Sequence, residues 1–129
     1  ALIVKNGKIL GEGSNSVTQL HDPTAHAEVQ AIRTACKNLS HFEIKDCELY
    51  TSCEPCPMCL GAIYWARPLA VYFAADKFDA AAGGFDDDFI YQEINKDHMQ
   101  RKIPFKKIPH PKANLPFEEW LKNPNKLRY

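Results

Sequence analysis

The chain has 129 residues, which suits a single domain spanning residues 1–129 with a core of its own. Its 16 basic and 16 acidic residues cancel, so nucleic acid is not an expected partner. The sequence lacks the run of about twenty apolar residues that a membrane-spanning helix needs, and we expect no membrane partner. Five cysteines, an odd number, favour a reducing, cytoplasmic setting over a disulfide framework.

The first half of the chain alternates short β-prone runs with helical patterns. Residues 2–5 and 8–11 flank Asn6-Gly7, a dipeptide that favours a two-residue hairpin. The polar residues 15–22 predict a loop. Between residues 24 and 38, apolar side chains recur at helical spacing, which predicts a helix with one buried face.

A strand, a helix and a second strand are expected next. Residues 47–52 predict a strand, and a helix begins at Pro55 and ends before Pro68. Residues 69–75 form a nearly unbroken apolar run, which is typical of a strand covered on both faces. This order of elements predicts a parallel, right-handed crossover, and the fold class is therefore α/β.

Aromatic residues on these elements are expected to lie in the core: Tyr64, Trp65 and Phe73. Farther on, the proline-rich tract 103–116 predicts an edge strand and a connecting loop. Residues 116–121 predict a short terminal helix. Three of its side chains are expected to face inward: Phe117, Trp120 and Leu121.

Two short motifs carry most of the functional information: His26-Ala27-Glu28 and Glu54-Pro55-Cys56-Pro57-Met58-Cys59. One histidine and two cysteines suit a catalytic zinc site, which keeps its fourth position open for water. A carboxylate beside that water can take its proton and hand it on, and Glu28 is placed for this task. Positions 26 and 28 lie about 200° apart on a helix, so both approach one metal only near the helix N-terminus.

The cysteine pattern leaves alternatives open, because Cys53, Cys56 and Cys59 form two overlapping C-x-x-C pairs. Spacing alone does not choose between them. Iron–sulfur ligation is one alternative, although no fourth cysteine follows nearby and His26 would have no role. A redox pair is a second alternative.

Taken together, the two motifs resemble the signature of zinc-dependent nucleobase deaminases, H-x-E followed by P-C-x-x-C. The resemblance implies one zinc ion per chain, bound by His26, Cys56 and Cys59. It also implies that Glu28 is the proton shuttle and that Cys53 is not a ligand. The implied fold is a three-layer α/β/α sandwich around a mixed five-stranded sheet, with zinc between two helix N-termini whose dipoles favour thiolates.

Deaminases of this kind usually have a helix before the first strand. This sequence begins at that strand, so the N-terminal helix is missing, and truncation is the expected reason. One face of the sheet is then expected to lie open.

Three stretches resemble bacterial guanine deaminases more than the related tRNA adenosine deaminases: residues 52–68, 84–91 and 125–129. The implied reaction is hydrolytic deamination of guanine to xanthine and ammonia, in purine salvage or catabolism, by a zinc-activated water. Deamination of guanosine or of tRNA adenosine remains an alternative. A zinc-stabilised binding module is the alternative that is not an enzyme, but it needs a fourth Cys or His ligand and has no use for Glu28.

Substrate-binding residues are expected at Asn15, Asp87 and Tyr129. Guanine presents donors at N1 and at its exocyclic amine, which a carboxylate such as Asp87 recognises. Without the resemblance, Asp87 would be interpreted as part of a solvated acidic run, and Asn15 as a turn residue that bonds its own backbone. The resemblance makes Tyr129 a lid over the small purine, in cis or in trans. We therefore expect a homodimer with exchanged C-terminal tails.

Overall fold

The computed structural model describes residues 1–85 and 87–128, and the chain divides into two compact units, Ala1–Tyr91 and Gln92–Tyr129. The first unit begins with strands β1 (Leu2–Lys5) and β2 (Lys8–Glu12). They pair antiparallel through Asn6 and Gly7, whose φ angles of 50° and 75° fit a tight hairpin turn. The hairpin predicted from the sequence is thus confirmed.

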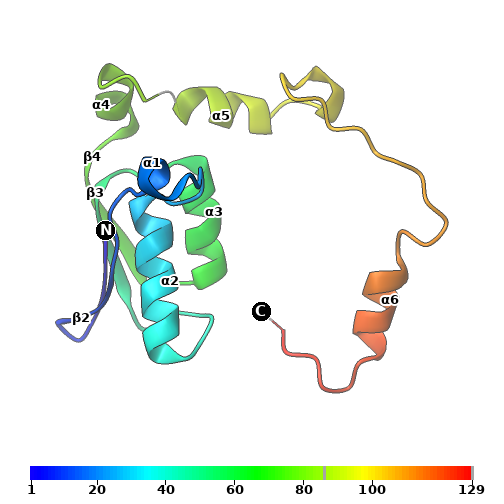
Figure 1. Cartoon of the computed structure of the whole chain (residues 1–129), viewed down its shortest axis with the longest axis horizontal. Coiled ribbons are helices and arrows are strands. Elements are labelled where there is room, and N and C mark those ends of the chain that lie inside the picture. Colours follow the sequence, from blue (N-terminus) through cyan, green and yellow to red (C-terminus); the bar gives the residue numbers. More distant parts are fainter. Residues whose placement is uncertain (86, 129) are drawn as a thin grey trace. The chain divides into compact units, whose positions relative to one another are not determined.

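Four strands form the sheet of the described residues, in the order β2-β1-β3-β4 (Figure 1). Strand β3 (Glu48–Cys53) pairs antiparallel with β1 and parallel with β4 (Ala70–Ala75). The α/β class, the mixed sheet and the parallel crossover are therefore confirmed, whereas the described residues form four of the five strands that were expected. The edge strand expected within residues 103–116 is absent from the described chain, because its prolines lack the N–H groups that a strand ladder needs.

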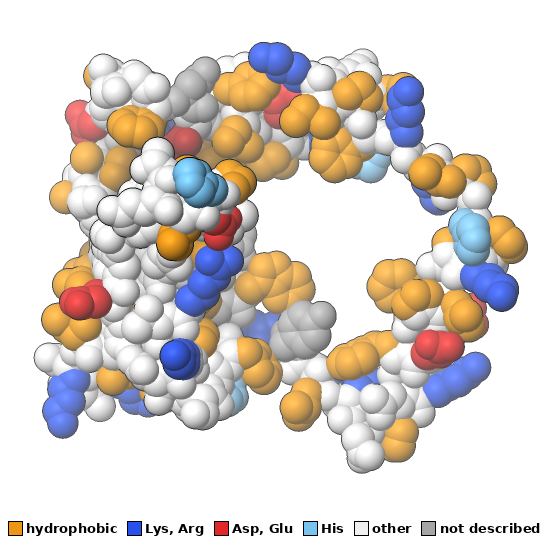
Figure 2. All heavy atoms as spheres, viewed as in Figure 1, with side chains coloured by type: hydrophobic (Ala, Val, Ile, Leu, Met, Phe, Trp, Pro, Cys, Tyr) orange, Lys and Arg blue, Asp and Glu red, His pale blue; other side chains and the backbone are white. Residues whose placement is uncertain are grey.

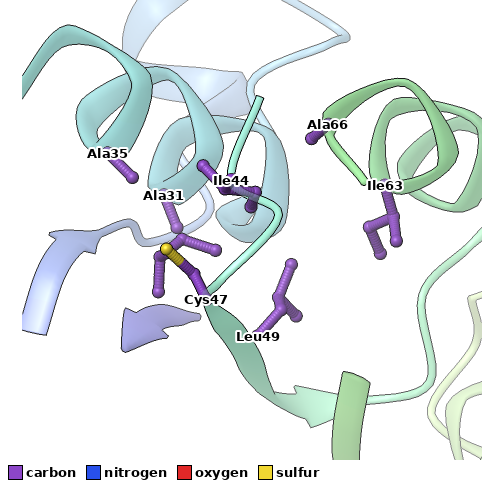
Figure 3. Close-up of a cluster of buried hydrophobic side chains, with 8 residues drawn as sticks. Ala31, Ala35, Ile44, Cys47, Leu49, Ile63 and Ala66 are labelled. Atoms are coloured by element: carbon purple, nitrogen blue, oxygen red, sulfur yellow. The ribbon is translucent and has the colours of Figure 1, made fainter. Parts of the chain in front are cut away.

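Helices α2 (Ala27–Leu39) and α3 (Pro57–Ala66) lie on the same side of the sheet (Figure 1). Their buried faces pack on the sheet in one core cluster (Figure 3), which comprises Ile3, Ala31, Ala35, Ile44, Cys47, Leu49, Ile63 and Ala66. Strand β2 runs very close to α2 at Gly11, where even a Cβ atom would lie 2.5 Å from the carbonyl oxygen of Ala31. This packing holds the middle of α2 close against the sheet.

The other face of the sheet is open in the described residues of this unit, as the sequence predicted. Ile9, Tyr50 and Tyr72 are exposed on it, and the two tyrosine rings stack with centroids 4.8 Å apart. The expectation that β4 is covered on both faces is wrong. Strand β4 is an edge strand of the described sheet, and Phe73 is 49% exposed.

The aromatic residues of α3 also differ from expectation. Tyr64 and Trp65 are 76% and 62% exposed, so they do not contribute to the core of this unit. The helix buries Cys59, Ile63 and Ala66, which are spaced along one face, and the two aromatic residues lie on the opposite side. Helix α3 is thus apolar on both its buried and its exposed faces.

Shorter helices complete the first unit. Helix α1 (Val17–Leu20) lies within the segment that was expected to be a loop, and α4 (Lys77–Ala82) follows β4. Asp76 caps α4 by accepting hydrogen bonds from two backbone N–H groups of its first turn. Helix α5 (Asp87–Ile94) continues into the second unit.

The second unit contains a 3₁₀ turn, η1 (His98–Gln100), and helix α6 (Leu115–Lys122). The predicted terminal helix is confirmed, but its expected inward packing is wrong, because Phe117 and Leu121 are each 68% exposed. Figure 2 shows hydrophobic side chains at the surface along this part of the chain. No helix of the described residues is long and apolar enough to cross a membrane.

Candidate active site

Two helix N-termini carry the first parts of the site. His26 is the N-cap of α2 and Cys56 is the N-cap of α3, both with extended backbone conformations. Pro57 occupies the start of α3, where its fixed φ suits the first helical turn and its missing N–H costs nothing. The two helices begin at the same end of the sheet, so their positive dipole ends meet there (Figure 1).

The side chains of His26, Cys56 and Cys59 form a group that fits a metal ion. Their ligand atoms all lie within 4.8 Å of one another, and the Nδ1 atom of His26 is 3.5 Å from the Sγ atom of Cys56. Ligands at zinc distances of about 2.0–2.3 Å in a tetrahedron lie about 3.5 Å apart, so little movement is needed. Three protein ligands leave one position for water or substrate.

The two grouped cysteines shift each other's pKa in opposite directions. Contact with the Cys59 side chain, the backbone N–H groups of Cys59 and Met58, and the charge of His26 lower the pKa of Cys56 from 9.0 to about 6. The same contact with Cys56, together with burial and the charge of Glu28, raises the pKa of Cys59. These contacts favour the thiolate form of Cys56, the form in which cysteine binds a metal.

Cys53 lies apart from this group. Its Sγ atom is 3.8 Å from the carbonyl oxygen of Asp76, and burial raises the pKa of the thiol. Of the two overlapping C-x-x-C pairs, the structure therefore joins Cys56 and Cys59 to His26.

Glu28 lies beside the metal-binding group, in the first turn of α2. It is buried, with 8% of its surface exposed. Its Oε1 atom accepts a hydrogen bond of 3.1 Å from the Thr51 hydroxyl, and its Oε2 atom accepts one of 3.4 Å from the Cys59 thiol. The carboxylate thus bridges strand β3 and the metal-binding group.

A cavity of about 410 Å³ opens onto this carboxylate. Its size falls in the range of small-molecule sites. Asn15 and Asp87 both line it, so the cavity brings these two residues together with His26 and Glu28. The Oδ1 atom of Asn15 also accepts the backbone N–H of Val17, as a turn residue does. Tyr129 and Asp86 lie outside the described residues.

Two residues hold the surrounding segments in place. The Oε2 atom of Glu54 accepts the backbone N–H of Lys77, which ties α4 to the loop before Cys56. Thr51, which reaches Glu28 from β3, belongs to neither of the two sequence motifs. The only local signal is the alternation along β3, which turns Leu49, Thr51 and Cys53 toward the helices while Tyr50 and Ser52 are exposed.

A three-ligand metal group with an open position and a buried carboxylate beside it define a metal-dependent hydrolase. Residues 1–75 match the family model of the cytidine and deoxycytidylate deaminase zinc-binding region. The chain belongs to this family and is a zinc-dependent aminohydrolase. Zinc is its cofactor, and His26, Cys56 and Cys59 form the candidate zinc site. This family membership excludes the alternatives of an iron–sulfur cluster, a redox-active cysteine pair and a purely structural zinc site.

Within this family, the chain is more similar to some proteins than to others. The chain is 58% identical to a guanine deaminase from Bacillus subtilis over 129 residues, which is all of this chain and 83% of the relative. The crystal structure of a Bacillus subtilis guanine deaminase matches with a TM-score of 0.97, at 58% identity, over 99% of this chain and 82% of that one. A tRNA-specific adenosine deaminase from Aquifex aeolicus is 35% identical over 122 residues, 95% of this chain and 78% of the relative.

Proposed function

We propose that the protein hydrolyses guanine to xanthine and ammonia. The observation that carries this proposal is the cavity in which the carboxylate of Asp87 joins Glu28 and the metal-binding group. The higher identity to a guanine deaminase than to a tRNA adenosine deaminase, 58% against 35%, supports the same choice of base. The alternatives are guanosine and the adenosine of a tRNA.

Base recognition follows from hydrogen-bond chemistry. The Watson–Crick edge of guanine carries donors at N1 and at the exocyclic amine, and an ionised Asp87 accepts from both. Adenine has an acceptor at N1 and a donor only at its exocyclic amine. One carboxylate oxygen then faces a lone pair without a donor, at a cost of about 1–3 kcal/mol. Because the Oδ1 atom of Asn15 is already bonded to Val17, its amide nitrogen is the atom that donates to an acceptor on the purine.

The reaction moves two protons from the attacking water, one to a ring nitrogen of guanine and one to the departing amine. When bound, zinc acts as a Lewis acid that lowers the pKa of a water molecule toward neutrality. Glu28 takes one proton from this water as its oxygen attacks C2 of guanine, and delivers it to the ring nitrogen N3. Glu28 then takes the second proton from the new hydroxyl group on C2 and passes it to the amine. The C2–N bond breaks, ammonia leaves and the C2 carbonyl of xanthine forms. The burial of Glu28 leaves its carboxylate reachable only from the cavity, which limits the access of other water molecules.

The decisive experiment measures ammonia release from four substrates: guanine, guanosine, cytosine and an adenosine-containing tRNA. We expect turnover of guanine far above that of the other three, and loss of turnover after zinc is removed by a chelator. A preference for guanosine or for the tRNA would replace the proposed substrate. Absence of turnover with all four, in a chain that retains zinc, would overturn the proposal that guanine is the substrate.

We also propose that residues 1–129 work as one deaminase domain within a homodimer that exchanges C-terminal tails. Both units expose apolar side chains that a partner would cover: Tyr64 and Trp65 on α3, and Phe117 and Leu121 on α6. Exposed apolar surface of this kind is typical of interaction sites. In this arrangement the tail of one protomer, with Tyr129, closes the cavity of the other.

Mixing two inactive chains tests the exchange. One chain lacks residues 125–129 and the other carries Glu28→Gln. In an exchanged dimer, a hybrid contains one site with an intact Glu28 and a borrowed tail, so activity returns on mixing. If the tail acts within its own chain, no hybrid site is complete and activity stays low. Sedimentation of a fully active monomer would also exclude the dimer.

The five free cysteines support a reducing, cytoplasmic location, which we include in the proposal.

A further inference from the structure

We infer that Thr51 is a positioning residue that fixes the orientation of the Glu28 carboxylate, an inference that rests on the proposed function. Thr51 lies on β3, 23 positions from Glu28 in sequence, and its hydroxyl donates a 3.1 Å hydrogen bond to the Oε1 atom of Glu28. Its side chain is half-buried and faces the helices, as Leu49 does. The contact therefore joins the sheet directly to the first turn of α2.

The other hydrogen bond to this carboxylate depends on a proton that metal binding removes. The Cys59 thiol donates to the Oε2 atom of Glu28 at 3.4 Å. A cysteine ligand is a thiolate and has no proton to donate. Of the two described side-chain donors to Glu28, only Thr51 therefore keeps its hydrogen bond in the zinc-loaded protein.

A single retained donor makes the two carboxylate oxygens different. The Oε1 atom is occupied by Thr51, in a hydrogen bond strengthened by the negative charge. The Oε2 atom lies on the side of Cys59 and the metal-binding group, and it is the oxygen left to take and return the proton. Threonine suits this task because its β-branched side chain restricts χ1. Thr51 thus selects which oxygen of Glu28 acts as the shuttle.

Two substitutions separate the hydroxyl from the shape of the side chain. Thr51→Val keeps the volume and removes the hydroxyl, whereas Thr51→Ser keeps the hydroxyl. We expect Thr51→Val to lower kcat for guanine by about tenfold to a hundredfold with little change in KM, the scale expected for a misoriented catalytic group. Thr51→Ser should return kcat to within about threefold of the wild type, a small loss by the same measure. Zinc content should be unchanged in both.

Thr34→Val is the matched control. Thr34 lies on the exposed side of α2, the helix that carries Glu28, and its hydroxyl donates to the carbonyl oxygen of Gln30 at 2.9 Å. Thr34 does not line the cavity. This variant should keep the wild-type kcat. If Thr51→Val fails to fold, Thr51→Ala, which places no methyl group against Glu28, should show the same loss.

Stability provides a readout that does not depend on turnover. In denaturant unfolding at a fixed zinc concentration, the effects of Thr51→Val and Glu28→Ala should be non-additive, because the two side chains share one hydrogen bond. The effects of Thr34→Val and Glu28→Ala should add. The inference is overturned if Thr51→Val turns over guanine like the wild type, or if Thr51→Ser is as impaired as Thr51→Val. A wild-type chain that does not deaminate guanine would instead overturn the proposed function and leave the stability test to decide on Thr51.

Discussion

The Nδ1 atom of His26 lies 3.5 Å from the Sγ atom of Cys56, although the two residues are 30 positions apart in the sequence. They meet because α2 and α3 begin at the same end of the sheet and each presents its N-cap residue there. A metal group built from two N-caps depends on the packing of both helices. Changes at the group should therefore affect zinc content, folding and catalysis to different degrees.

The first prediction concerns the metal ligands. Cys56→Ser should lose zinc and unfold at lower denaturant concentration, because zinc binding contributes to the free energy of folding. Cys53→Ser is the control, since Cys53 lies outside the metal-binding group, and it should retain zinc. Metal analysis of the purified variants provides the measurement. The reverse pattern would show that the other C-x-x-C pair binds the metal.

The second prediction separates metal binding from proton transfer. Glu28→Gln should keep zinc but retain no more than about one hundredth of wild-type turnover, since an amide cannot accept and return the proton and such catalysis contributes about 10²–10⁴-fold. Turnover is measured as ammonia release from guanine, with zinc content determined on the same sample. Turnover well above this level would mean that another group is the base.

The third prediction tests Asp87 as the group that recognises the base. Asp87→Ala should depress turnover of guanine while zinc content and unfolding stay close to those of the wild type. Asp88, the next residue of the acidic run, does not line the cavity, so Asp88→Ala is the control that should leave turnover unchanged. If the Asp87→Ala variant turned over guanine as fast as the wild type, Asp87 would be a solvated surface residue and not the group that recognises the base.

The fourth prediction concerns the close packing of β2 on α2. Gly11→Ala should lower the free energy of unfolding by about 1–3 kcal/mol, the usual cost of overpacking, because the added Cβ would lie 2.5 Å and 2.6 Å from backbone atoms of Ala31 and Ala35. Gly61→Ala is the contrasting variant. Its Cβ meets nothing within 4 Å, and alanine favours the helix, so stability should rise by about 0.5–1 kcal/mol. Denaturant unfolding measures both changes. Similar effects at the two sites would contradict the packing argument.

The hairpin and the two long helices were predictable because their signals are local. Asn6-Gly7 favours its turn through the conformations of those two residues alone. The periodicity of α2 and the proline at the start of α3 likewise act within a few residues. Pairing of the two deaminase motifs pointed to the family in the same way, since each motif is a short run of side chains.

Burial was harder to predict, because it depends on what lies next to an element. The apolar run of β4 predicted a strand covered on both faces, but β4 is at the edge of the described sheet and leaves Tyr72 exposed. Tyr64 and Trp65 have the composition of core residues, yet α3 packs through its other face. Composition reports that a side chain is apolar, and only the neighbouring elements determine whether it is covered.

By itself, the sequence determined the class of chemistry: one histidine, two cysteines and a carboxylate at the spacing of a zinc deaminase. Only the tertiary structure decided which of the three clustered cysteines lie with His26 and which hydroxyl reaches Glu28. Cys53, Cys56 and Cys59 are equally spaced along the chain, so spacing cannot rank them as ligands. Their distances from His26 and the contact of Thr51 with Glu28 arise when β3 and two helices pack together, which brings side chains 23 to 31 positions apart into contact.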